Sequence, residues 1–182
     1  EKLQADPGAF RFTSFKTGQT VERFPWQKRR EWMPQDAPWP PPGVSLTLEF
    51  VAPTAATNLP ASVRGVTVEV HYELYDGIPL LSKWIVVRNG GDQPVRLNSF
   101  ICEILAAVEG ESIVDSSPTW HLPNLLVETD YSFCGMSGPN HSAGVHWVDD
   151  PLYHTQVNYE RTTPCLLECR PPLGPDQIIA AG

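Results

Sequence analysis

The residues best suited to chemistry in this sequence are histidines in segments rich in Pro, Gly and Asn. His141 and His146 lie five residues apart with Gly144 between them, and His154 follows after Asp149–Asp150. Residues five apart on a strand point to opposite faces, so a shared metal ion would require a bend near Gly144. We therefore predict no metal site. Two other roles stay open: hydrogen bonds to a polar ligand, or local hydrogen bonds within the loops.

Tryptophans beside predicted loops form a second candidate for ligand binding. Sugar rings stack on flat aromatic faces, while carboxylates and amides bind their hydroxyl groups. Five of the six tryptophans lie in or beside predicted loops, and Trp84 lies within a core-like strand. Loop aromatics also anchor Pro-rich segments or fill domain interfaces, and we predict such an interdomain or partner surface at Trp26, Trp32 and Trp39. The hypothesis for a carbohydrate site comprises Trp120, His121, Asn140, His141, His146 and Trp147.

Familiar catalytic motifs are absent: the sequence has no Gly-rich phosphate loop, no Gly-x-Ser-x-Gly elbow and no His-Glu-x-x-His. Glycoside hydrolysis needs two carboxyl groups that face one sugar. Glu69 and Glu73 share one side of a predicted strand but are ~13 Å apart along it, and we interpret them as solvated. No catalytic residue and no cofactor is predicted.

Charge and composition exclude several partners. The chain has 182 residues, with 13 Lys and Arg against 21 Asp and Glu, and its formal charge of −8 would repel a nucleic-acid backbone. No apolar run approaches the ~20 residues that span a bilayer, so neither nucleic-acid nor membrane binding is predicted. The four cysteines lack the spacing of a zinc site; we interpret them as buried thiols, and a disulfide from either of the first two to a later one stays open. They are Cys102, Cys134, Cys165 and Cys169.

Nineteen prolines divide the chain into short runs, which favours strands over long helices. Alternation of apolar and polar residues predicts strands at 44–50 and 66–75. Asp76–Gly77 predicts a tight turn to a returning strand at 80–88, whose apolar residues on both sides indicate a central strand. A separate hairpin is predicted within residues 10–24, with strands at its two ends and a turn at residues 16 to 19.

The second half of the chain predicts shorter strands. The run 95–108 fits either a bulged strand or helical spacing, and we favour the strand. Short strands at regular spacing indicate an antiparallel β-sandwich, a supersandwich present in whole or in part, with a long Pro- and Trp-rich loop at 25–43. Because the chain begins without Met and stops without a closing element, we expect residues 1–182 to be a single domain cut from a longer multidomain chain. The later short strands are predicted at 124–131, 145–148, 154–159 and 165–169.

Residues 66–97 carry two hairpins in series with a recognisable pattern. A strand ends in Tyr-Glu-Leu, an Asp-Gly-x-Pro turn follows, the next strand carries Lys83 and Trp84, and Asn-Gly precedes a strand that begins with valine. This pattern resembles the amino-terminal β-supersandwich of α-galactosidase-like glycoside hydrolases, in the galactose-mutarotase-like fold group. The resemblance implies that both catalytic Asp residues belong to a following (β/α)₈ barrel. This domain would then be inert, would pack on that barrel, and would lend residues to the sugar pocket or to oligomer contacts.

Two alternatives accompany this leading hypothesis of a non-catalytic domain. One is a mutarotase-like aldose epimerase, an enzyme type that uses a His acid and a Glu base. Asn140–His141 is similar to a motif of those enzymes, but residues 142–144 depart from its aromatic continuation and the chain is too short for the complete fold. The other alternative is a structural or protein-interaction domain without sugar affinity.

Overall fold

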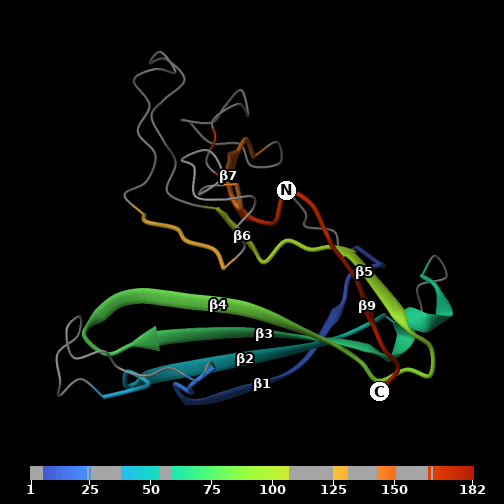
Figure 1. Cartoon of the computed structure of the whole chain (residues 1–182), viewed down its shortest axis with the longest axis horizontal. Helices are drawn as coiled ribbons and strands as arrows, with labels where there is room; N and C mark the ends of the chain where they lie inside the picture. Colours follow the sequence, from blue (N-terminus) through green and yellow to red (C-terminus); the bar gives the residue numbers. More distant parts are fainter. Residues whose placement is uncertain are drawn as a thin grey trace. The chain divides into compact units, whose positions relative to one another are not determined.

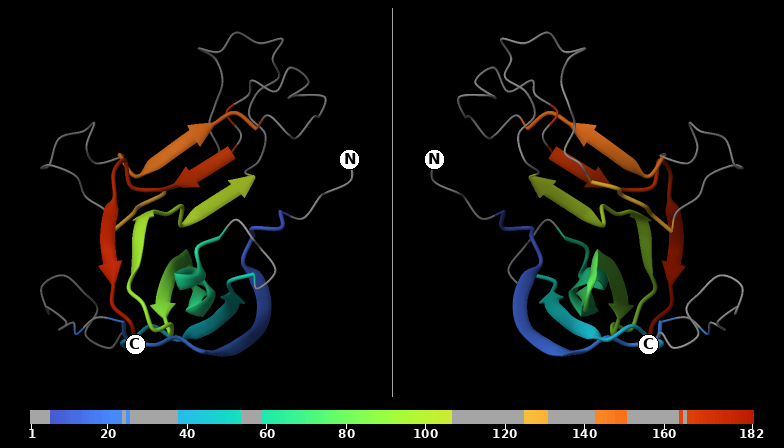
Figure 2. Two further views of the ribbon diagram at one scale, coloured as in Figure 1. Left: turned by 90° about the vertical axis from the view of Figure 1, so that its right-hand side faces the viewer. Right: turned by 90° about the vertical axis from the view of Figure 1, so that its left-hand side faces the viewer.

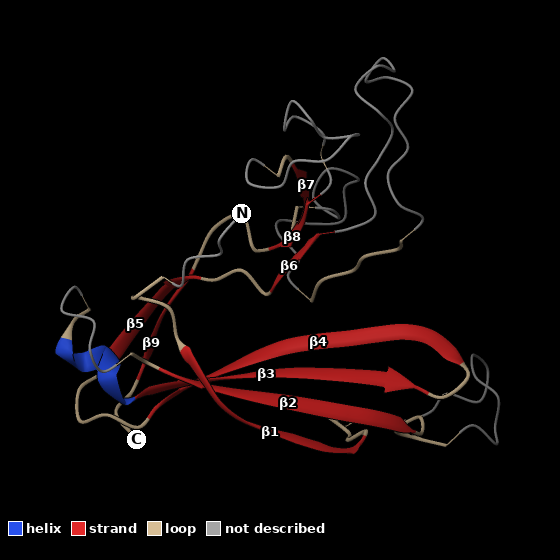
Figure 3. Ribbon diagram, turned by 180° about the vertical axis from the view of Figure 1, so that it is seen from behind, coloured by secondary structure: helices blue, strands red, loops and turns tan. Residues whose placement is uncertain are grey.

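The computed structural model describes residues 6–23, 25, 38–53, 59–106, 125–130, 143–150, 164 and 166–182. Strands make up 54% of these residues and helix 4%, against a usual strand share of about 20–25%. Among the described residues the only helix is one short 3-10 turn, η1 (Ala61–Gly65), drawn in blue in Figure 3. In this part of the chain no helix has the length and apolar character needed to cross a membrane. The predicted all-β, antiparallel, sandwich-like class is confirmed.

The chain divides into two compact units. Unit 1 comprises Glu1–Arg96 and Ile178–Gly182, and unit 2 comprises Leu97–Gln177. Strands β5 (Val95–Ser99) and β9 (Pro175–Ile179) pair as a two-stranded sheet, and each strand has residues in both units. The prediction that residues 1–182 form one domain of a longer chain stays a prediction.

Unit 1 is built on a four-stranded antiparallel sheet in which strands consecutive in sequence are neighbours (Figure 1). The strands predicted at 44–50 and 66–75 are confirmed, as is the Asp76–Gly77 turn. Gly77 has a φ of 73°, which glycine adopts without steric cost. The four strands are β1 (Arg11–Gln19), β2 (Gly43–Val51), β3 (Val66–Tyr75) and β4 (Ile78–Asn89).

Two predictions for this sheet are wrong. Residues 10–24 do not form a hairpin, because β1 runs on through the supposed turn and pairs with β2, so that Gly18 lies opposite Ser45. Here the non-local partner strand prevails over a local turn signal. Strand β4 was expected to be central, but it lies at the edge of the four-stranded sheet.

A bulge in β1 decides which of its side chains reach the apolar face. Thr13 is an extra residue between Phe12 and Ser14, which pair with consecutive residues of β2. One extra residue reverses the alternation that follows it. Phe12 and Phe15 therefore share a face although they are three residues apart.

A second bulge lies at the start of β4. Tyr75 pairs with Ile78, but Leu74 pairs with Leu81, so Pro79–Leu80 have no partners on β3. Proline has no N–H to donate to the ladder, which suits it to such a position. Two extra residues preserve the alternation and shift by two the β4 partners of all β3 residues from Leu74 back to Val66.

The apolar face of the sheet is buried at one end and half-exposed at the other. Val66, at the start of β3, is 5% exposed. Next to the β3–β4 turn, one row across three strands consists of Val44, Leu74 and Leu81, which are 51%, 53% and 53% exposed. The paired residues place these and other apolar side chains on this face, including Leu46, Leu48, Phe50, Val68, Val70, Ile85 and Val87.

Unit 2 contains a three-stranded antiparallel sheet with β8 (Leu166–Cys169) between β6 (Glu103–Ala106) and β7 (Val145–Val148). In Figure 2 these are the red, yellow-green and orange strands that lie side by side. Leu167 and Cys169 are the buried residues of this sheet.

Several predictions fall on unit 2. Within the run 95–108, the described residues 95–106 form strands, as favoured, but they divide into β5 and β6. The strands at 145–148 and 165–169 are confirmed over the residues described. Residues 125–130 form no strand, contrary to prediction, and 154–159 lie outside the described residues. Cys102 and Cys169 carry thiols, and the Cys102 N–H donates to the Cys169 carbonyl at 2.8 Å; Cys134 and Cys165 lie outside the described part of the chain.

Candidate functional site

The second face of the four-stranded sheet gathers polar side chains from all four strands. We call it the polar face. Its central row places His71 of β3 between Thr47 of β2 and Trp84 of β4. Paired residues in an antiparallel sheet point to the same side, so the neighbouring rows face the same way. On β1 the polar face includes Ser14 and Lys16, which lie opposite Glu49 and Thr47. On the other strands it comprises Ser45, Thr47 and Glu49, then Thr67, Glu69, His71 and Glu73, and finally Ser82, Trp84, Val86 and Arg88.

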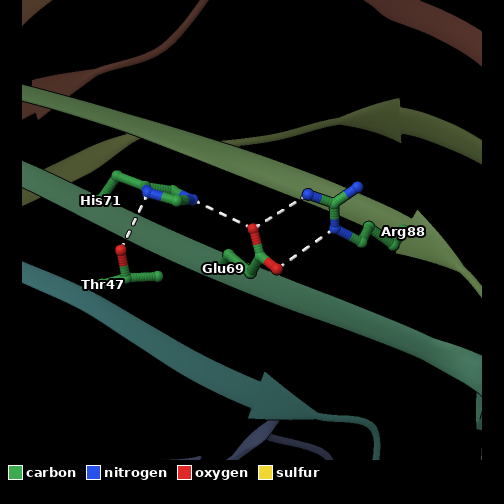
Figure 4. A network of polar contacts seen from close by, with 4 residues as sticks. All are labelled: Thr47, Glu69, His71 and Arg88. Atoms are coloured by element: carbon green, nitrogen blue, oxygen red, sulfur yellow. Dashed lines mark hydrogen bonds and ion pairs between the residues drawn. The ribbon is translucent and has the colours of Figure 1, made fainter. Parts of the chain in front are cut away.

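A continuous hydrogen-bonded network crosses the polar face (Figure 4). Thr47 Oγ1 lies 3.1 Å from His71 Nδ1, and His71 Nε2 lies 3.1 Å from Glu69 Oε2. Arg88 binds the same carboxylate with two groups, from Nε to Oε1 at 3.2 Å and from Nη2 to Oε2 at 3.3 Å. Bidentate contact of this kind fixes the guanidinium plane against the carboxylate.

The charge state of Glu69 determines the hydrogen positions in this network. Hydrogen bonds from Arg88 hold the pKa of Glu69 below its ordinary value; burial opposes this effect, and His71 adds to it. An ionised carboxylate only accepts hydrogen bonds, so His71 Nε2 must carry a hydrogen. In neutral His71 the other ring nitrogen then accepts from the Thr47 hydroxyl. If the ring is protonated, that hydroxyl can turn and accept instead.

Glu73 forms a buried cluster beside the network. It is 2% exposed, and its carboxylate accepts the Val21 N–H at 3.0 Å and the Tyr75 hydroxyl at 2.8 Å. The Ser82 hydroxyl lies 3.0 Å from the same phenol, and because the single phenol hydrogen goes to Glu73, Ser82 donates to it. Burial raises the pKa of Tyr75, which keeps the phenol a hydrogen-bond donor. Glu69 and Glu73 were expected to be solvated, and that prediction is wrong.

The cover over Glu73 comes from residues 20–23, which follow β1 and which we call the strap. The Val21 N–H reaches Glu73 on β3, and the Arg23 guanidinium lies 4.3 Å from the ring centroid of Trp84 on β4. Because β1 is at the opposite edge of the sheet, the strap crosses the polar face. This non-local crossing explains why a residue in an alternating strand is fully buried.

The strap is also bound to the far end of the Pro- and Trp-rich connection. The Thr20 hydroxyl donates to the Pro41 carbonyl, and the Trp39 indole N–H donates to Glu22 at 3.3 Å. Trp39 therefore lies in the part of this connection that leads into β2, and part of its ring is exposed. Trp26 and Trp32 lie outside the described residues, and the partner surface predicted at these three tryptophans stays a prediction.

Trp84 lies on the polar face rather than in a core. The His71 ring stacks on it with centroids 4.8 Å apart and an angle of 7° between the planes. Arg23 provides the second contact described above. The indole thus stands beside the Thr47–His71–Glu69–Arg88 network.

The residues predicted for a carbohydrate site are described only in part. His146 and Trp147 are neighbours on β7, so they point to opposite faces: His146 lies opposite Glu168, and Trp147 lies opposite Leu167. His146 Nε2 is buried with no hydrogen-bond partner among the described residues, while Glu168 pairs with Arg170 at 3.0 Å. The site as a whole stays a prediction, because Trp120, His121, Asn140 and His141 lie outside the described residues.

Sequence reasoning missed the polar-face network, although a signal for it was present. Alternation places Thr47, Glu69 and His71 on the polar side of their strands. The partners on β4 depend on the bulge at Pro79–Leu80, because a regular two-residue hairpin would pair His71 with Ser82 instead of Trp84. Pro79 is consistent with a bulge at this position, but it does not determine by how many residues the pairing shifts.

This arrangement can bind polar groups. Arg88 is 62% exposed, and only two of its five N–H groups are used by Glu69. In the part of the chain that the structure describes, no group of three metal-ligating side chains occurs.

No family model, curated protein or solved structure matches the chain.

Proposed function

We propose that this chain is a non-catalytic β-sandwich domain of a carbohydrate-active enzyme, an α-galactosidase-like glycoside hydrolase, and that its polar face binds sugar hydroxyl groups. Packing on the catalytic barrel of a parent chain belongs to the same proposal. The observation that carries it is the Thr47–His71–Glu69–Arg88 network on the polar face of the sheet.

The network offers what a polyhydroxylated ligand needs. A sugar hydroxyl both donates and accepts, and the network presents guanidinium donors next to carboxylate lone pairs. Each group is held by its neighbours, so little side-chain freedom is lost on binding. The hydrogen bonds restrict Glu69 on both sides, while Arg88 keeps N–H groups directed to solvent.

The geometry favours binding over hydrolysis. Glycoside hydrolysis uses a carboxyl group with a raised pKa as its acid, together with a second carboxylate. Arg88 and His71 lower the pKa of Glu69, and Glu73 is buried beneath the strap. Glu49 lies directly opposite Glu69, so these are two neighbouring carboxyl groups of the kind that glycoside hydrolysis uses. The test below therefore includes a Glu49 variant as a control for hydrolysis.

Calorimetric titration of the chain with methyl α-galactoside tests the proposal. We expect saturable binding in the millimolar range, its loss in Arg88→Ala, and its retention in Arg64→Ala, which removes the same charge from η1. Absence of saturable heat would overturn the sugar-binding function. Hydrolysis of nitrophenyl α-galactoside that is faster than in buffer, and that Glu49→Gln abolishes, would contradict a non-catalytic domain.

A second candidate is a structural or protein-interaction domain, which the half-exposed row on the apolar face favours. Val44, Leu74 and Leu81 would bury further apolar area against a partner. An apolar dye such as ANS should bind the chain and lose most of its fluorescence in Leu74→Lys with Leu81→Lys. No dye binding by the unmodified chain would contradict an available apolar row.

A further inference from the structure

We infer that Cys102 and Cys169 of unit 2 form a redox-sensitive pair, which a small disulfide oxidant such as oxidised glutathione converts into a disulfide bond. The bond would join the residue before β6 to the last residue of β8. The spacing of the four cysteines leaves several pairings open, and the backbone geometry selects this one. The inference does not depend on sugar binding by the polar face.

Two consecutive residues, Cys102 and Glu103, lie opposite Cys169. Glu103 pairs with Cys169 in the ladder between β6 and β8. The Cys102 N–H donates to the Cys169 carbonyl at 2.8 Å. Two residues opposite one partner make a β-bulge, in which one of the two is an extra residue. Cys102 is therefore the bulge residue at the start of β6.

The backbone of Cys169 is directed towards β6 rather than β7. On the β7 side, Cys169 lies opposite Val145, and the hydrogen bond there comes from the next residue, with the Arg170 N–H on the Gly144 carbonyl at 3.0 Å. Successive residues of a central antiparallel strand bond alternately to its two neighbours, so the polar backbone groups of Cys169 serve the β6 side. Its carbonyl is thus placed to accept from the bulge.

The bulge brings the two cysteines within the range of a disulfide. Residues that share a backbone hydrogen bond across an antiparallel pair have Cα atoms about 5.5 Å apart, and disulfides span Cα separations of about 4.4–6.8 Å. In a regular strand Cys102 would point to the side opposite Glu103. A bulge interrupts this alternation, and the two residues that face one partner point to the same side as that partner. Cys102 and Cys169 therefore share one side of the sheet.

The different exposure of the two thiols gives them separate roles. Cys102 is half-buried, whereas Cys169 is buried. The Cys102 thiolate attacks oxidised glutathione, forms a mixed disulfide and releases one glutathione thiolate. The Cys169 thiolate then attacks the Cys102 sulfur and releases the second glutathione thiolate. Two protein thiols are oxidised, one glutathione disulfide is reduced to two thiols, and the two protons pass through solvent to the glutathione thiolates.

The bond would close a long segment of unit 2. Residues 103–168 lie between the two cysteines, and they include the residues predicted for a carbohydrate site. A cross-link that closes a loop of this length restricts the unfolded chain. The oxidised form should therefore unfold at a higher urea concentration than the reduced form.

Incubation of the full chain with mixtures of oxidised and reduced glutathione, followed by alkylation and digestion with a Glu-specific protease, tests this inference. A glutamate lies between every two consecutive cysteines, so digestion places each cysteine in its own peptide. Mass spectrometry should find one disulfide, between the Cys102 and Cys169 peptides, while Cys134 and Cys165 are alkylated. The urea midpoint should rise on oxidation and return after treatment with dithiothreitol.

Two matched variants separate this pair from the other cysteines. Cys102→Ser should lose the linked peptide and the rise in the urea midpoint, whereas Cys134→Ser should keep both. The peptide map of the unmodified chain does not depend on how the variants fold. A disulfide from Cys169 to Cys134 or Cys165, or alkylation of all four thiols in excess oxidised glutathione, would overturn the inference. So would the same single link after oxidation in concentrated urea, because the folded geometry would then not select it.

Discussion

The two faces of the four-stranded sheet are held by different kinds of interaction. On the apolar face, contacts need no fixed partner, and exposure changes gradually from Val66 to the row with Leu74 and Leu81. On the polar face, each group depends on named partners, as Glu73 depends on the strap and Glu69 on Arg88. The apolar face therefore tolerates small displacements, whereas the polar face requires a specific register.

Loss of the buried carboxylate should have the largest effect. Glu73→Ala leaves the Val21 N–H and the Tyr75 hydroxyl without their acceptor, and we expect the free energy of unfolding to fall by about 2–3 kcal/mol. Urea denaturation measures the change. Glu49→Ala, on the same face and without such burial, should change it by less than about 0.5 kcal/mol. Equal effects of the two substitutions would remove the distinction between the buried cluster and the rest of the polar face.

On the apolar face the cost of truncation should follow burial. Leu48→Ala, in the part-buried middle of β2, should destabilise by about 2 kcal/mol, and Leu74→Ala, in the half-exposed row, by about 1 kcal/mol. Thermal or urea unfolding provides both values. If Leu74→Ala lowered the free energy of unfolding more than Leu48→Ala, another part of the protein would have to cover the half-exposed row.

The smallest effect should come from the network and should depend on pH. The folded-state pKa of Glu69 lies below its ordinary value of 4.5, so its contribution is fully present above that value and is lost as pH falls through the lower, folded pKa. Glu69→Gln should cost about 0.5–1 kcal/mol at pH 7. The difference from the unmodified chain should shrink below about pH 4.5. A difference that stays constant from pH 7 to pH 3 would contradict the ionised Glu69.

Local patterns predicted the elements that local chemistry determines. Alternation placed the strands at 44–50 and 66–75, and Asp76–Gly77 placed their turn, because each signal lies within a few residues. The pairing of β1 with β2 joins segments separated by a long connection, and it replaced the hairpin expected within residues 10–24. The class of fold was thus predictable, while the partners of β1 were not.

The candidate site was less predictable for the same reason. Glu73 sits in an alternating strand and gives no sign of burial, because its cover is a strap that crosses from the opposite edge of the sheet. Trp84 was interpreted as a core residue because its strand is apolar on both sides, yet the register places it beside His71. Residues chosen for their loop position, such as His146 and Trp147, point to opposite faces of β7.

The most direct test of the polar face as a ligand site is a map of backbone amide shifts during titration with methyl α-galactoside. We predict saturable shifts that cluster at Thr47, Glu69, His71 and Arg88, with the apolar row around Leu74 unaffected. Shifts confined to β6, β7 and β8 of unit 2, or no saturable shifts at all, would contradict the assignment of the polar face as the binding surface.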